Sequence, residues 1–123
     1  VRGDGVTRTI ANNISLFDST TIAGSSDLIF SGTLTSSDNH TLTNNNSGST
    51  TFGNVNLSNS ATDRTLTITG TGNTVISGVI ANGSTSTTSG ITKEGTGTLT
   101  LDGNNTYGGT TTLTAGTIEV GHN

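Results

Sequence analysis

Apolar residues recur along the chain in short runs, at intervals of roughly 20 to 25 residues. Each of five runs carries one apolar residue at a matching place, and these anchors are Phe30, Phe52, Ile76, Leu101 and Val120. Their separations are 52−30 = 22, 76−52 = 24, 101−76 = 25 and 120−101 = 19 residues. Self-similarity at this period is typical of solenoids, in which each repeat forms one coil. We therefore expect the anchors to stack above one another along one wall.

The pattern inside the runs predicts strands. Apolar and polar residues alternate in 66–68 and 99–101, as expected when one face of a strand meets a core. Further apolar positions between the anchors would form another wall of each coil: Val55, Leu57, Val79, Ile80 and Leu113. No stretch has helical periodicity. The predicted fold is all-β, a right-handed parallel β-helix (β-solenoid) of about five coils of 19–25 residues, with two or three strands per coil.

The apolar pattern also predicts the domain organisation. It is absent near the start, so we predict a loose N-terminal segment over residues 1–9 and a single β-solenoid domain over 10–123. The low-complexity runs 44–49 and 83–90 interrupt the pattern, which resumes in phase after each, and we interpret both as turns projecting from the rod. Because the chain begins with Val1 and not Met, we expect it to come from a longer precursor.

Composition narrows the class of protein. Only 27% of the chain is hydrophobic and 3% aromatic, too little for a compact core of the usual size. Charged residues are 10% and proline is absent, which argues against ordinary disorder. The net charge of −4 excludes a phosphate-neutralising surface, so nucleic acid is not an expected partner. No apolar run approaches the roughly 20 residues of a membrane span, so we expect no membrane insertion.

A denser pattern occupies residues 91–118. It contains a lysine, a Gly-x-Gly, alternating leucines, a Gly-x-Asn-x-Tyr, a Gly-Thr turn and an Ala-Gly pair. These features fall on Lys93, Gly95, Gly97, Leu99, Leu101, Gly103, Asn105, Tyr107, Gly109, Thr111, Ala115 and Gly116. The run resembles the passenger-associated transport repeat of bacterial autotransporter passengers, although Thr110 stands where the family often has a second glycine.

This resemblance covers about a quarter of the chain. It implies a parallel β-helix displayed at, or released from, a Gram-negative-type outer membrane, with the repeat aiding folding during export. The implied localisation is extracellular or at the bacterial outer-membrane surface. Passengers of this kind serve as adhesins, stalks and carriers of enzymatic domains, so the resemblance names no particular activity.

Candidate catalytic and metal-binding residues are scattered. The carboxylates are Asp4, Asp18, Asp27, Asp38, Asp63, Glu94, Asp102 and Glu119. Asp38 and Asp63 lie about one coil apart and would be the pair to stack on one face, as a polysaccharide-cleaving site requires, but we favour turn capping for these side chains. His40 and His122 are too isolated for a metal site, and cysteine is absent. We predict no enzyme, no catalytic residues, no metal and no cofactor.

Two further patterns, a tripeptide near the start and alternating threonines, can each be explained by a function or without one. Arg2-Gly3-Asp4 spells an integrin-binding tripeptide, which we attribute to chance in a loose terminus. Threonines at every second position in 65–71 and 110–114 match the arrangement of ice-binding solenoids. The uneven coil spacing should make regular rows hard to build, and threonine is simply a good strand former.

The function we expect is structural or adhesive, as a segment of a cell-surface or secreted autotransporter-type protein. Stacked coils leave unpaired strand edges at both ends of a rod. We therefore expect the partners to be other copies, stacked end to end into fibres, or adjoining coils of a longer chain, with surface glycans as a further partner. The alternatives are an ice-binding solenoid and a glycan-binding or glycan-cleaving β-helix.

Overall fold

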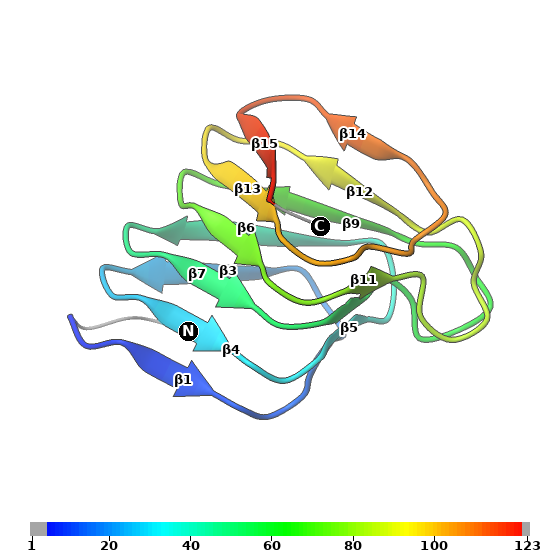
Figure 1. Cartoon of the computed structure of the whole chain (residues 1–123), viewed down its shortest axis with the longest axis horizontal. Helices are drawn as coiled ribbons and strands as arrows, with labels where there is room; N and C mark the ends of the chain where they lie inside the picture. The colour runs from blue at the N-terminus through cyan, green and yellow to red at the C-terminus, as the bar shows by residue number, and fades with distance from the viewer. Residues whose placement is uncertain (1–4, 122–123) are drawn as a thin grey trace.

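The structure is a computed structural model and describes residues 5–121, which form parallel strands stacked in coils (Figure 1). The strands are β1 (Arg8–Ile10), β2 (Ile14–Leu16), β3 (Thr20–Gly24), β4 (Leu28–Phe30), β5 (Leu34–Ser36), β6 (His40–Asn46), β7 (Thr50–Phe52), β8 (Val55–Asn56), β9 (Thr65–Thr69), β10 (Thr74–Ile76), β11 (Ile80–Ala81), β12 (Gly90–Lys93), β13 (Thr98–Leu101), β14 (Thr111–Leu113) and β15 (Thr117–Val120). Over this range there is no helix, and hence none long and apolar enough to span a membrane.

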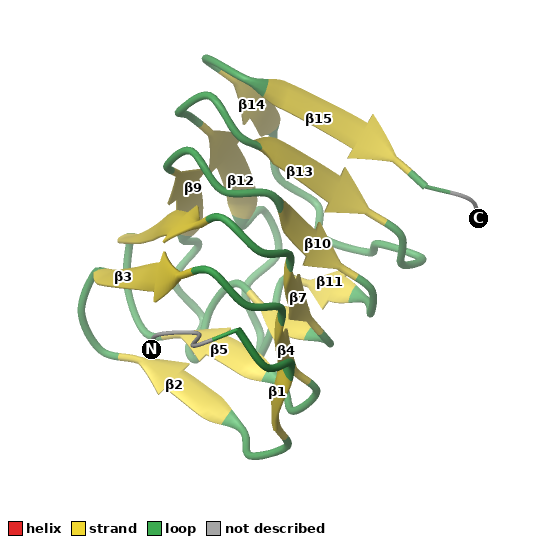
Figure 2. Ribbon diagram, turned by 90° about the vertical axis from the view of Figure 1, so that its left-hand side faces the viewer, coloured by secondary structure: helices red, strands yellow, loops and turns green. Residues whose placement is uncertain are grey.

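The strands form three parallel sheets that are the walls of a solenoid (Figure 2). The six-stranded sheet runs β1-β4-β7-β10-β13-β15, the five-stranded sheet β3-β6-β9-β12-β14, and the four-stranded sheet β2-β5-β8-β11. Each of the first four coils contributes one strand to each sheet. The fifth contributes β13 and β14, and β15 begins a sixth. The prediction of an all-β parallel β-solenoid of about five coils is confirmed.

The anchors stack as the sequence predicts. In the six-stranded sheet Phe30 pairs with Phe52, Phe52 with Ile76, Ile76 with Leu101, and Leu101 with Val120. The rings of Phe30 and Phe52 are stacked, with centroids 4.9 Å apart and planes 11° from parallel. One inward residue per coil therefore builds a continuous apolar column through the rod.

Sixteen aliphatic and aromatic side chains fill the interior. They are Leu16, Ile22, Leu28, Phe30, Leu34, Leu42, Phe52, Val55, Leu57, Leu66, Ile68, Ile76, Ile80, Ile91, Leu99 and Leu101. The wall predicted from the second apolar positions is partly confirmed, because Val55, Leu57 and Ile80 are fully buried. Val79, however, is 37% exposed, and Leu113 lies in the five-stranded sheet beside Lys93.

The run 44–49 does not project from the rod, so that prediction was wrong. β6 continues to Asn46, and the side chains of Asn44 and Asn46 are fully buried at the corner between two sheets. Asn44 Nδ2 donates to Thr74 Oγ1 at 2.9 Å, and Asn46 Nδ2 donates to the Ser26 carbonyl at 2.7 Å. A sharp corner turns backbone carbonyls inward, and buried amides satisfy them where an aliphatic side chain would not.

Two loops do project, after β8 and after β11, at the right-hand side of Figure 1. The run 83–90 forms most of the second loop, although Gly90 already begins β12. The first loop, over 57–64, was not anticipated, because its residues carry no low-complexity signature. At the other end, β1 begins at Arg8, two residues before the boundary expected from the apolar pattern, because backbone pairing needs no apolar side chain.

Candidate functional site

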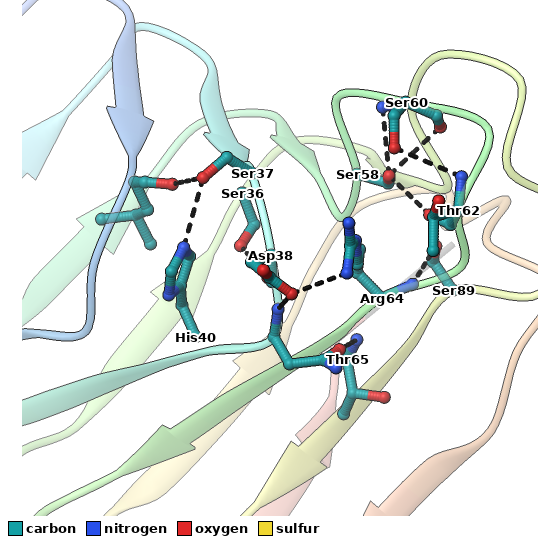
Figure 3. Close-up of polar contacts among 12 residues, drawn as sticks. Ser36, Ser37, Asp38, His40, Ser58, Ser60, Thr62, Arg64, Thr65 and Ser89 are labelled. Carbon is teal, nitrogen blue, oxygen red and sulfur yellow. Dashed lines mark hydrogen bonds and ion pairs between the residues drawn. The ribbon is translucent and has the colours of Figure 1, made fainter.

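A polar cluster joins the turn before β6 to the loop before β9 (Figure 3). Arg64 Nη1 and Asp38 Oδ1 are 2.6 Å apart, and Asp38 Oδ1 also accepts the Asn39 amide at 2.7 Å. The Arg64 amide donates to Ser89 Oγ at 3.0 Å, which ties in the next coil. Ser58 Oγ donates to the Thr62 carbonyl at 2.7 Å within the loop. The cluster therefore fastens three consecutive coils together.

Asp63 holds the two projecting loops side by side. Its carboxylate accepts the Thr88 hydroxyl at 2.5 Å and the amides of Thr88 and Thr87 at 2.7 and 2.8 Å. These bonds lower the pKa of Asp63, the Thr88 hydroxyl contributing most, because they stabilise the charged carboxylate. The Asp63 carboxylate therefore bonds the neighbouring loop. Asp38 pairs with Arg64 and not with Asp63, so the two carboxylates do not form a pair.

The turn-capping interpretation is confirmed for several of the scattered carboxylates. Asp18 accepts the Ser19 amide at 2.8 Å, and Asp27 accepts the Ser49 amide of the next coil at 2.8 Å. His40 Nε2 lies 3.2 Å from Ser37 Oγ. Within residues 5–121 no three metal-ligating side chains come together. Asp4, His122 and the tripeptide 2–4 lie outside the described residues.

Lys93 is a buried charged residue, and the sequence did not predict its burial. It is only 2% exposed, and its Nζ donates to the carbonyls of Glu94 and Gly95, the latter at 3.3 Å. Burial lowers the pKa of Lys93, because the charged ammonium loses hydration. The sequence shows that Lys93 belongs to the motif over residues 91–118, but the spacing of the motif residues does not show that its side chain points inward. There it satisfies carbonyls at the corner after β12, as Asn46 does lower in the stack.

The outer face of the five-stranded sheet carries threonines in register. Thr41 pairs with Thr67, Thr67 with Thr92, and Thr92 with Thr112, which makes a column across four coils. A second, shorter column consists of Thr21, Thr43 and Thr69. Uneven coil spacing was expected to make such rows hard to build, and the strand register shows that this expectation was wrong. The extra residues of the longer coils lie in the projecting loops, so the sheet itself stays in register.

The outer side of the six-stranded sheet holds a shallow polar groove of about 290 Å³. Its lining residues are Ser47, Gly48, Ser49, Asn73, Val75, Thr98, Thr100 and Glu119. Val75 and Thr100 are neighbours in register on adjacent strands, so the groove runs along the stack. It offers hydroxyls, an amide and a carboxylate beside one apolar side chain.

Comparison with known families gives one match. Residues 91–120 match the family model described as the passenger-associated transport repeat, which confirms the resemblance seen in the motif. The matched segment comprises β12, β13, β14 and β15, the C-terminal end of the stack. No curated protein and no solved structure matches the chain.

Proposed function

Because residues 91–120 form a passenger-associated transport repeat within a parallel β-solenoid, we propose that the chain is a rod-like length of an autotransporter-type passenger. It is secreted or displayed at the bacterial outer-membrane surface, where it holds neighbouring parts of the passenger at a fixed distance from the cell. The observation that carries the proposal is the coincidence of the transport repeat with the C-terminal coils of one continuous strand ladder. The proposed winding is right-handed, because parallel crossover connections almost always are.

An adhesive role is supported by the outer faces. The groove over Val75, Thr100 and Glu119 combines hydroxyl, amide and carboxylate groups with an apolar side chain, the mixture that contacts sugar rings and their hydroxyls. The net charge of −4 favours neutral over anionic glycans. We propose surface glycans as the ligand class of this groove.

Surface display tests the proposed function. The 123-residue chain, with an N-terminal epitope, is fused ahead of an outer-membrane translocator barrel in a Gram-negative host, and intact cells are labelled with antibody. We expect strong labelling, and protection of the rod from added protease, because the strands are paired and the two projecting loops are hydrogen-bonded to each other through Asp63, which leaves few unfolded sites. A chain of the same composition in scrambled order is the control. Export of the scrambled chain with equal efficiency would contradict the proposal.

Ice binding is the second candidate, favoured by one observation. The threonine columns present hydroxyl and methyl groups at about 4.8 Å along the stack and about 7 Å along each strand, a flat and regular array. Thermal hysteresis of the purified chain measures this activity. We expect Thr67→Leu to abolish it and Thr51→Leu, on the outer side of the six-stranded sheet, to leave it unchanged. Absence of hysteresis in the unmodified chain removes this candidate.

A further inference from the structure

Four side chains of the polar groove come from two neighbouring strands of the six-stranded sheet, β10 and β13, which lie side by side in Figure 2. Val75 lies in β10 and Asn73 directly precedes that strand, whereas Thr98 and Thr100 belong to β13. The residues that alternate with them are buried, so all four side chains are on the outer face. Both strands are paired on each side, so this part of the face is complete within the described residues.

Hydrogen bonds hold Asn73 in place and determine which of its side-chain atoms is left for a ligand. Its backbone carbonyl accepts the Thr50 amide at 3.2 Å and Asn44 Nδ2 at 3.1 Å. Its Oδ1 accepts the Thr98 amide of the next coil at 3.1 Å. Among the described residues Nδ2 has no hydrogen-bond partner. The groove therefore contains a positioned amide donor that the fold itself does not use.

The apolar part of the groove is small. Val75 is the one aliphatic side chain of the lining, and no aromatic residue belongs to it. It lies about 7 Å from Asn73 along the same face, since outward residues of a strand are two positions apart. A sugar ring packs its C–H face on a flat aromatic ring, which this lining lacks. A branched aliphatic side chain is instead suited to contact with a single methyl group.

We propose that the groove binds an N-acetylhexosamine and that Asn73 is its specificity-determining residue. The proposal rests on the proposed glycan-binding role of the groove and names the sugar substituent that it recognises. Asn73 Nδ2 donates to the acetamido carbonyl, Val75 packs against the acetamido methyl, and the Thr100 hydroxyl accepts the acetamido N–H. A sugar hydroxyl at the same ring position has no methyl group and leaves Val75 without an apolar partner.

The charge of the groove favours neutral sugars of this class. Its lining contains one carboxylate, Glu119, and no cation. The carboxylate of an acidic sugar would lose hydration there without gaining a partner. N-acetylated sugars that also carry an acid group are therefore expected to bind more weakly than neutral ones.

Two methyl glycosides that differ at one substituent, those of N-acetylglucosamine and of glucose, test the proposal on the 123-residue chain. In saturation-transfer NMR the acetamido methyl should receive the strongest saturation, and the acetylated sugar should bind at least about tenfold more tightly, because a matched donor and a methyl contact are added. Equal binding of the two glycosides overturns this inference and leaves the glycan-binding role intact.

A glycan array separates the two proposals further. Binding to terminal N-acetylhexosamines of surface glycans, or to polymers of N-acetylglucosamine, supports the inference and identifies the source of the sugar. Absence of binding to every glycan removes both the inference and the glycan-binding role, whereas the role as a rod is decided by surface display alone.

Three substitutions locate the site. Asn73→Asp keeps the oxygen that accepts the Thr98 amide but replaces the donor by an acceptor, so it should weaken binding at least about tenfold. Asn54→Asp is the matched control, because its Oδ1 accepts the Val79 amide at 2.9 Å outside the groove, and binding should stay unchanged. Val75→Thr keeps the side-chain shape and should reduce the preference for the acetylated sugar.

Circular dichroism should show the same strand content for these three variants, so that a loss of binding is not a loss of fold. Unchanged binding by Asn73→Asp overturns the proposal, and so does an equal loss in Asn54→Asp. A preference for the acetylated sugar that survives Val75→Thr in full overturns the assigned methyl contact, and with it the choice of ligand.

Discussion

Replacing Phe52 by alanine is expected to lower the free energy of unfolding by about 4 kcal/mol. The side chain is 3% exposed, and its ring stacks on Phe30 within the anchor column. Coils above and below are fixed by strand pairing, so they cannot collapse into the space that the ring leaves. A domain of ordinary stability, about 5–15 kcal/mol, would lose much of its margin.

Urea denaturation followed by far-ultraviolet circular dichroism measures the effect, at a concentration where the chain is monomeric. Phe17→Ala makes the same chemical change at a side chain that is 76% exposed, and it should alter stability by no more than about 0.5 kcal/mol. Equal losses for the two variants would show that the stacked rings of the anchor column contribute no more to stability than an exposed ring.

The anchor column was predictable because a solenoid repeats one environment. Each coil must place an apolar residue at the same point, so Phe30, Phe52, Ile76 and Leu101 mark that point by spacing alone, whatever the loops between them do. The capping aspartates were predictable for a related reason. A short acceptor side chain beside a turn has few partners other than nearby amides, and Asp18 and Asp38 each accept the amide of the following residue.

Residues whose role depends on an adjacent coil were not predictable in this way. The low-complexity run 44–49 predicts a projecting turn, because asparagine is depleted in strands and common in turns, whereas the stacked corner needs the buried amide donors of Asn44 and Asn46. The loop over 57–64 is held against the next loop, one coil further along, by hydrogen bonds to Asp63. Lys93 points inward because a carbonyl-lined corner accepts its ammonium, which no spacing in the sequence reveals.

The candidate binding surfaces also differ in whether they depend on one strand or on adjacent coils. Alternation identified the outward threonines on single strands, but whether they form columns depends on where the extra residues of each coil are placed. The polar groove beside Val75 and Thr100 was not visible from single strands, because its lining comes from turns and strands of adjacent coils.

The second large effect is expected at Gly103, within the transport repeat. A Cβ at this position would lie 1.9 Å from the Gly78 carbonyl oxygen and 2.4 Å from its carbon, in the coil directly below. Both neighbours are backbone, so no side chain can rotate away, and the fifth coil would have to lift off the fourth. We expect Gly103→Ala to lower the free energy of unfolding by about 3 kcal/mol.

Tyr107 provides the probe for this variant, because it is the one tyrosine in a chain without tryptophan and packs against the core in the same coil. Its fluorescence should change at lower urea than in the unmodified chain. Gly53→Ala is the matched control: the nearest atom to its added Cβ is the Ser31 carbonyl oxygen at 3.0 Å, a contact relieved by a small shift, and the cost should stay below about 1 kcal/mol. An unchanged Tyr107 transition for Gly103→Ala would mean that successive coils are not held at the close spacing on which the whole ladder depends.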